Sequence, residues 1–300
     1  MPVSVIVVAC VLGFVPQRLC SFMNDLMTAS PPGAGVLETA RAGDQTIVLR
    51  ARATAPLRLL CPRRGASAAW VYASSYGGGL VGGDHTNLRV DVQPGSQCVL
   101  CTQASTKVYR CAPGKQCRQE VDAVVGRDGL LVVAPDPITC FADAWYEQQQ
   151  SFRLQEGGNL VLVDWVTSGR HARNEVWEFA HYATRFSIEY AGRLVVSDAL
   201  VLDPAQGPLR SPYRVGRFHC LATMVVLGDQ LTPLVDAAWQ TQAADTPQQH
   251  SRQVETVSSV DGGVILRVAG MSTEGVFRTL QQRLSFLEPL LGDAPWSRKW

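Results

Sequence analysis

The sequence predicts a mainly β protein, and three observations support this. Short stretches in which apolar and polar residues alternate recur along the chain, as in residues 88–92. Turn residues such as Pro94-Gly95 and Asp128-Gly129 separate these stretches. Helical periodicity is rare by comparison. Short strands with turn chemistry between them are typical of a β-rich domain rather than of βαβ units.

The expected strands follow from runs of apolar or alternating residues bounded by turn residues. In chain order they are residues 88–92, 98–101, 121–125, 130–134, 151–154, 160–165, 185–189, 194–202, 219–227 and 264–268. Residues 203–216 and 240–252 are expected to be loops, because they are rich in proline and glycine or in glutamine and threonine.

One amphipathic helix of about 14 residues is expected near the C-terminus. Ser272 and Thr273 offer N-caps and Pro289 ends the pattern. A weaker helical pattern covers residues 232–239. The apolar residues that share one face of the C-terminal helix are Val276, Phe277, Leu280, Leu284 and Leu287.

Composition narrows the classes of function. The 300 residues are 46% hydrophobic and 18% charged, with a formal net charge of +1. A near-neutral chain lacks the basic field that nucleic acid binding needs. No apolar run reaches the roughly 18 residues of a membrane span. We therefore expect neither nucleic acid nor membrane as a partner.

The chain is expected to hold one large domain over residues 31–300, preceded by an extension of doubtful role over residues 1–30. Residues 3–15 are apolar and have the length of a signal-peptide core, but no Lys or Arg precedes them. Met23 and Met27 are alternative starts. A signal, an extension and a misplaced start site all stay open.

Nine cysteines allow a zinc site or a disulfide framework to be considered. The number is odd and the spacings are irregular, which favours reduced cysteines used as small core residues. Cys98 and Cys101 lie in a predicted strand, where residues three apart point to opposite faces. The spacing of Cys111 and Cys117 does not fit a zinc knuckle.

The segment from Tyr76 to Asp84 holds five glycines in seven positions: Gly77, Gly78, Gly79, Gly82 and Gly83. Glycine permits positive φ and close backbone approach, so the backbone here must lie close to another group. The segment matches a dinucleotide-binding fingerprint only formally, because a strand pattern rather than a helix follows it. A P-loop is excluded because Gly83-Asp84 stands where lysine is needed.

The remaining candidates for catalysis are weak. The five histidines show no metal-ligand spacing, and His85 next to Asp84 is best explained as a turn residue. There is no GxSxG motif and no defensible Ser/His/Asp order. The residues therefore favour a binding or scaffold protein over an enzyme. A β-rich hydrolase that uses acidic residues, and a purely structural binding protein, remain the alternatives.

Four motifs in order resemble the UreD (UreH) family of urease accessory proteins, in a eukaryotic-like branch. They are YGGGLVGGD at 76–84, TQASTKVYR at 102–110, PDPI leading to FAD at 135–143, and DWVTSGR with ARNEVW at 164–177. The resemblance extends from residue 40 to about residue 290.

The resemblance implies an all-β core with strands stacked in a two-layer, β-helix-like arrangement. It implies a non-catalytic, cytoplasmic chaperone of urease metallocentre assembly. Such a scaffold would bind apo-urease and the complex of UreF with the GTPase UreG, with two copies of each partner in the assembly. Nickel would pass through an internal polar channel, with no tightly bound cofactor.

The candidates for a transient nickel path are the acids of the shared motifs, Asp84, Asp136 and Asp143. A carboxylate and carbonyl path with retained water suits an ion that must be released again. For Asp84 a turn-capping role is the alternative. For Asp136, which lies between two prolines, a structural role is the alternative.

Other motif residues have expected structural or binding roles. Lys107 and Tyr109 should share one face of a strand, so that one orients the other or pairs with an acid. For four polar and aromatic residues of the last motif we expect either a buried ion pair or interface anchors. These residues are Arg170, Arg173, Glu175 and Trp177. Phe141 and Asp164 are expected to be structural residues of their motifs.

Overall fold

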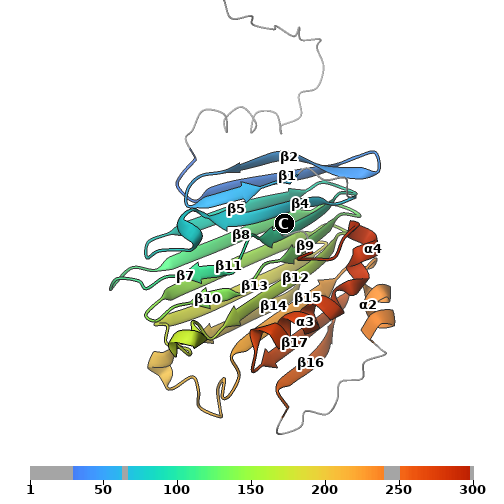
Figure 1. Cartoon of the computed structure of the whole chain (residues 1–300). Coiled ribbons are helices and arrows are strands. Elements are labelled where there is room, and N and C mark those ends of the chain that lie inside the picture. Colours follow the sequence, from blue (N-terminus) through green and yellow to red (C-terminus); the bar gives the residue numbers. More distant parts are fainter. Residues whose placement is uncertain (1–29, 63–66, 240–250, 298–300) are drawn as a thin grey trace, which may run out of the picture. The chain divides into compact units, whose positions relative to one another are not determined.

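Figure 1 shows the computed structural model of the chain, which describes residues 30–62, 67–239 and 251–297. From residue 32 onward the described residues form one compact unit. The extension expected over residues 1–30 lies outside the described residues except for its last residue. The loop expected over residues 240–252 lies outside them except for its last two residues.

Most of the described residues form two β-sheets, which confirms the predicted fold class. Within the described part of the chain, sheet A has seven strands and sheet B has ten. In spatial order, sheet A consists of β14 (Arg193–Leu202), β13 (His181–Tyr190), β11 (Trp145–Leu154), β8 (Cys117–Val125), β5 (His85–Val92), β1 (Ala34–Ala42) and β2 (Gln45–Ala53). Sheet B consists of β16 (Gln253–Val260), β17 (Gly263–Gly270), β15 (Cys220–Leu227), β12 (Asn159–Thr167), β9 (Leu130–Ala134), β6 (Gln97–Thr102), β4 (Ala69–Ser75) and β3 (Leu57–Leu60). The short strand β10 (Ile138–Cys140) pairs with β12, and the short strand β7 (Thr106–Val108) pairs with β10.

The chain winds between the two sheets. Strands β5, β8, β11 and β13 lie in sheet A, and β6, β9 and β12 alternate with them in sheet B. Within each sheet these strands are parallel to their neighbours. Each parallel crossover is therefore a strand of the other sheet instead of a helix. The two stacked sheets resemble a β-solenoid (Figure 1).

Tight turns join the strands at one end of the sheets. Gly95, Asp128 and Gly157 adopt positive φ angles of 69°, 56° and 78° in successive turns. The turns stack, and the Gly95 amide donates to the Arg127 carbonyl at 2.9 Å. Because the strands are parallel, the longer loops all gather at the opposite end, which we call the motif end. These loops are residues 76–84, 103–116, 135–144, 168–180 and 203–219.

Apolar side chains fill the space between the sheets toward the tight turns. The alternation predicted for residues 88–92 is confirmed, because Leu88, Val90 and Val92 are buried while Arg89 and Asp91 are exposed. The same core takes Phe152 and Phe186 from sheet A and Leu160 and Leu162 from sheet B. This core holds the two layers together.

A second core lies on the outer face of sheet B, under helices α2 (Thr232–Trp239) and α3 (Thr273–Arg283). Val276 and Leu280 of α3 pack in one cluster with Met224 and Leu266 of the sheet. Figure 1 shows α3 lying across β15 and β17, which it contacts. Both predicted helices are confirmed.

The C-terminal helix is shorter than predicted. The Ser272 side chain caps it and accepts from the Gly275 amide at 3.0 Å, but α3 ends at Arg283. A 3-10 turn, η4 (Ser285–Leu287), and a short helix, α4 (Glu288–Leu291), follow. Pro289 was expected to stop the helix, but it lies in the first turn of α4, where proline is tolerated because that amide has no intrahelical acceptor.

We expect the substitution Asn159→Ala to lower the free energy of unfolding by about 2 kcal/mol, because buried polar groups would lose their partners. Asn159 is fully buried, its side-chain amide donates to the Gly157 carbonyl at 2.8 Å, and its side-chain oxygen accepts from the Gln230 amide at 3.2 Å. Urea denaturation measures the loss. The exposed control Gln281→Ala should change stability by less than about 0.5 kcal/mol. Equal effects of the two substitutions would contradict the role assigned to Asn159.

Candidate functional site

The glycine-rich segment at the motif end packs against the chain itself. Leu80 forms an isolated parallel bridge with Val108, and its amide donates to the Lys107 carbonyl at 2.8 Å. A Cβ atom added at Gly79 would lie 2.6 Å from a ring carbon of Tyr109 and 2.7 Å from the Lys107 oxygen. The close backbone approach predicted from the glycines is therefore an approach to β7.

Asp84 caps the turn that this segment forms. Its carboxylate accepts from the Val81 amide at 2.9 Å, and its own amide donates to the Val81 carbonyl at 2.9 Å. Gly77, Gly78 and Gly83 supply the positive φ angles of the turn, at 80°, 72° and 106°. The geometry is that of the capping alternative, and a nickel-binding role for Asp84 stays a prediction.

The other two candidate acids lie in different surroundings. The half-buried Asp136 carboxylate accepts from the Thr102 hydroxyl at 3.0 Å, and the Asp136 amide donates to the same hydroxyl at 2.7 Å. Asp143 is exposed, has a φ of 60° and pairs with Arg110 at 2.8 Å. The three predicted acids do not form one cluster, and the nickel role of each remains a prediction.

The motif residues around Phe141 form an aromatic and charged contact. The Arg170 guanidinium lies 4.1 Å from the centre of the Phe141 ring, and Tyr109 meets the edge of that ring. Arg170 also pairs with Glu175 through two hydrogen bonds, which lower the pKa of that carboxyl. Of the two expected arrangements, the structure contains the ion pair, between Arg170 and Glu175. Trp177, the other proposed anchor, is buried and donates to the Phe218 carbonyl at 3.0 Å.

A row of polar side chains crosses the inner face of sheet A. The strand register places Thr86 of β5 beside Gln119 of β8, Gln119 beside Gln148 of β11, and Gln148 beside Thr184 of β13. Each lies an even number of residues from core-facing neighbours, so all four point inward. The Tyr146 hydroxyl ties the row together at 2.6 Å from the Gln119 side-chain oxygen and 2.8 Å from that of Gln148.

Sheet B carries a matching polar row. Register places Asp164 of β12 beside Thr223 of β15, Thr223 beside Arg267 of β17, and Arg267 beside Thr256 of β16. The Thr184 hydroxyl of sheet A donates to the Asp164 carboxylate at 2.7 Å and so joins the two rows. We call these two rows the polar layer; its members are Thr86, Gln119, Gln148, Thr184, Asp164, Thr223, Arg267 and Thr256.

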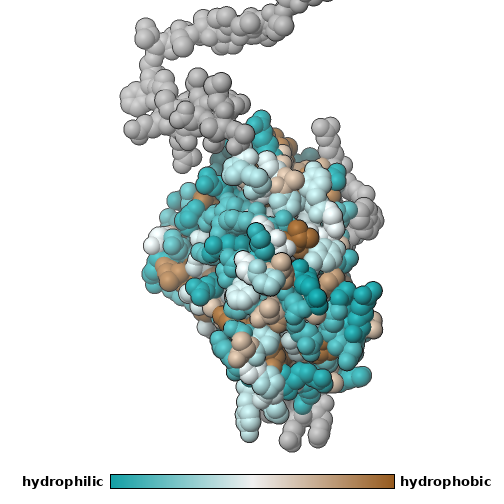
Figure 2. All heavy atoms as spheres, turned by 90° about the vertical axis from the view of Figure 1, so that its left-hand side faces the viewer, coloured by the Kyte–Doolittle hydropathy of each residue, from teal (hydrophilic) through white to brown (hydrophobic). Residues whose placement is uncertain are grey.

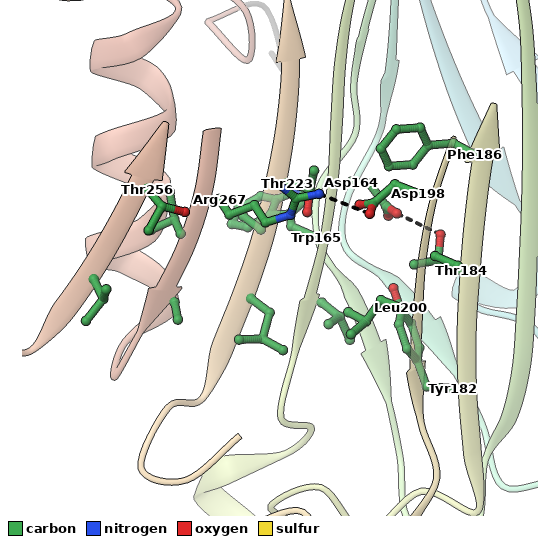
Figure 3. A pocket seen from close by; sticks show the side chains of 17 residues that line it. Asp164, Trp165, Tyr182, Thr184, Phe186, Asp198, Leu200, Thr223, Thr256 and Arg267 are labelled. Atoms are coloured by element: carbon green, nitrogen blue, oxygen red, sulfur yellow. Dashed lines mark hydrogen bonds and ion pairs between the residues drawn. The ribbon is translucent and has the colours of Figure 1, made fainter. Parts of the chain in front are cut away.

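Two cavities lie along the polar layer. The smaller has a volume of about 140 Å³, and Thr86, Gln119 and Thr102 are among its lining residues. The larger has a volume of about 320 Å³ (Figure 3). Its polar lining consists of Asp164, Tyr182, Thr184, Asp198, Thr223, Thr256 and Arg267. Asp136 does not line the smaller cavity, but its carboxylate accepts a hydrogen bond from Thr102, which does.

The larger cavity has the electrostatics of a desolvated acidic site. Asp164 is 7% exposed, and burial is the main cause that raises the pKa of its carboxyl to about 6. The hydrogen bond from Thr184 lowers this pKa, and the nearby Asp198 raises it. The Tyr182 hydroxyl is buried and, within the described part of the chain, has no hydrogen-bond partner. Unpaired buried polar groups are costly and point to a site that takes up water or an ion.

No cage for a tightly held metal is found within residues 30–62, 67–239 and 251–297, because no three His, Cys, Asp or Glu side chains there are placed to hold one. Cys98 belongs to the core between the sheets and Cys101 to the core under the helices, so the two thiols face opposite ways. The oxygen atoms of the polar layer are spread along it singly or in pairs, an arrangement that suits weak binding of a divalent cation.

The described helices include none that is long and apolar enough to span a membrane. The loops of the motif end present a mostly hydrophilic surface with scattered hydrophobic residues (Figure 2). Among the large apolar side chains exposed in these loops, Tyr76 is 58%, Val81 is 54% and Tyr213 is 97% exposed.

Fold and site together define a class of protein, a β-solenoid-like sandwich with a polar layer inside it. The family of UreD urease accessory proteins matches residues 32–300. The chain is 45% identical to the urease accessory protein UreD of Sorangium cellulosum, with 95% of this chain and 90% of that protein covered. It is 34% identical to urease accessory protein D of Arabidopsis thaliana, with 81% and 92% covered. The chain therefore belongs to the UreD family of urease accessory proteins.

A further relative is the uncharacterized urease accessory protein ureD-like of Schizosaccharomyces pombe, 31% identical with 61% of this chain and 66% of that protein covered. The resemblance read from the four motifs is confirmed. The names of the relatives describe accessory proteins, which fits the expected non-catalytic role.

Sequence reasoning placed Asp164 in a motif but missed its partners in the polar layer. Gln119, Gln148 and Thr184 occupy inward positions of their strands. The available signal was a polar residue at an inward position of an alternating strand: Gln119 and Thr184 lie two positions before an inward apolar residue, and Gln148 lies four positions before one.

We expect Asp164 to make the stability of the wild-type protein depend on pH. Its pKa is about 6 when folded and near the model-compound value of 3.8 when unfolded. Between these values the folded state holds a proton that the unfolded state has lost, so the free energy of unfolding falls as the pH rises. The fall amounts to about 3 kcal/mol, and Asp164→Asn should remove it. Chemical denaturation of both proteins from pH 4 to pH 8 tests this, and identical pH profiles would contradict it.

Proposed function

We propose that this chain is a scaffold of urease maturation that holds apo-urease and the UreF–UreG complex together and passes nickel between them. The observation that carries the proposal is the polar layer, a row of polar side chains along which two cavities lie. Membership of a family of urease accessory proteins supports the same role.

The chemistry of the polar layer supports transit over storage. Hydroxyl, amide and carboxylate oxygens bind Ni²⁺ less tightly than thiolates do, and retained water can complete its coordination. Asp164 and Asp198 are the acidic residues that line the larger cavity, and Asp136 bonds to Thr102, which lines the smaller one. Nickel is the cargo in this account, and no resident cofactor is needed.

The motif end supports a docking role. It gathers five loops on one side of a rigid pair of sheets, and binding residues are commonly carried on loops of this kind. Exposed Val81 and Tyr213 offer apolar contacts beside charged residues, a mixture that interfaces share. We place UreF with UreG and apo-urease at different faces of one assembly that holds two copies of each, in the cytoplasm.

Reconstitution tests the proposal directly. Apo-urease, UreF, UreG, GTP and Ni²⁺ are incubated with and without this chain, and urease activity is measured. We expect activation only when the chain is present. Equal activation without it would remove the scaffold role, and turnover of small substrates by the chain alone would favour the hydrolase alternative.

Two variants of Asp84 separate a nickel role from a capping role. Asp84→Asn keeps an oxygen that accepts from the Val81 amide but removes the charge, whereas Asp84→Ala removes both. If Asp84 binds nickel in transit, we expect both variants to lose most of the activation. If Asp84→Asn activates urease as well as the wild type does, Asp84 only caps the turn. Pull-down of UreF controls for complex formation.

A further inference from the structure

Two ion pairs bridge the sheets where β14 forms the edge of sheet A. Arg267 of β17 pairs with Asp198 of β14 at 3.0 Å. Arg193, the first residue of β14, pairs with Asp261 in the turn between β16 and β17. In sheet B, β17 and β16 are the last two strands at one edge. Both ion pairs therefore join β14, the edge strand of sheet A, to this edge of sheet B.

Only one of these pairs borders the larger cavity. Asp198 and Arg267 both line it, while Arg193 and Asp261 do not. The side chains of Arg267 and Asp198 are 44% and 26% exposed, and those of Arg193 and Asp261 are 70% and 65% exposed. The Arg267–Asp198 pair thus lines the cavity and is also partly exposed to solvent, whereas the Arg193–Asp261 pair is mostly exposed and lies outside the cavity lining.

The charges inside the cavity explain what Arg267 does there. Figure 3 shows its guanidinium reaching the Asp198 carboxylate, beside which lies the Asp164 carboxylate held by Thr184. Arg267 is the only cationic side chain among the described residues that line this cavity. Among the described lining residues, the positive charge beside Asp198 therefore comes from Arg267 alone.

We propose that the Arg267–Asp198 ion pair is a displaceable latch on the larger cavity, in which the guanidinium closes the mouth until a divalent cation takes its place beside the carboxylates. This proposal rests on the proposed function, because the cation that displaces the guanidinium is the nickel that the chain is proposed to pass on. When the pair opens, the cavity communicates with solvent at the edge of the sandwich. When it closes, the ion inside is confined to the polar layer.

The strength of the pair suits this role. A partly exposed ion pair contributes little net stability, commonly below about 1 kcal/mol, so it opens readily. A divalent cation between two carboxylates competes well with one guanidinium, because its charge is twice as large.

The test measures how fast Asp164 becomes accessible. The full-length protein is treated with a water-soluble carbodiimide and glycinamide at one fixed pH, and mass spectrometry follows modification of Asp164. We expect Arg267→Gln to raise the modification rate about fivefold, the effect of losing roughly 1 kcal/mol of closure. The matched control Arg193→Gln removes the other bridge and should leave the rate unchanged. Equal rates in Arg267→Gln and wild type, or an equal rise in both variants, would overturn the latch.

A conservative variant guards against misfolding. Arg267→Lys keeps the positive charge and should modify at nearly the wild-type rate. If Arg267→Lys is as fast as Arg267→Gln while both give the wild-type circular dichroism spectrum, charge does not hold the mouth closed and the proposal fails.

Nickel itself provides the second measurement. Ni²⁺ added before the carbodiimide should protect Asp164, at an about fivefold lower concentration in Arg267→Gln than in the wild type or Arg193→Gln. Absence of protection in every variant would overturn the competition between cation and guanidinium. If urease activation depends on the chain but Arg267→Gln is labelled at the wild-type rate, the latch is wrong and the proposed function stands. If labelling behaves as expected but the chain does not promote urease activation, the proposed function is wrong and the latch stands.

Discussion

The parallel register of β5, β8, β11 and β13 is the constraint on which the rest of the structure depends. It lines up Thr86, Gln119, Gln148 and Thr184 across four strands that are widely separated in sequence. A slip of one residue in any strand would turn its inward set outward and break both the polar row and the apolar core beside it. The tight, stacked turns at the end of the sheets away from the motif end fix this register, because such short connections allow little shift of one strand against the next.

The polar layer lowers the stability that the protein interior could otherwise provide. A buried polar group without a partner costs about 1 to 3 kcal/mol, and apolar side chains would fill the same space without that cost. Tyr146, Gln119 and Gln148 offset part of it by bonding to one another, and Thr184 does so for Asp164. The buried Tyr182 hydroxyl has no partner among the described residues, and Tyr182 lines the larger cavity. A row that is only partly satisfied is easier to understand as a route for water and ions than as a device for stability.

Local chemistry made part of this structure predictable. The alternation around Val90, the glycine turns and the C-terminal helix all depend on residues close in sequence, and all were predicted. The capping role of Asp84 was open as an alternative because an acid at the end of a glycine turn accepts local amides. The polar layer was out of reach, because it exists only through the pairing of strands about 30 residues apart. The same reason explains why Asp136 and Asp143, neighbours in sequence, lie in unlike surroundings.

The most direct test of the account replaces the bonded part of the polar row by apolar residues of similar size. The combined variant Thr86→Val, Gln119→Leu, Tyr146→Phe and Gln148→Leu removes donors and acceptors together, so it leaves few orphaned groups and should keep its stability. Urease activation in the reconstituted system is then measured beside the free energy of unfolding. The account predicts a variant as stable as the wild type that no longer promotes activation. Full activation by that folded variant would contradict the claim that the polar layer carries the function.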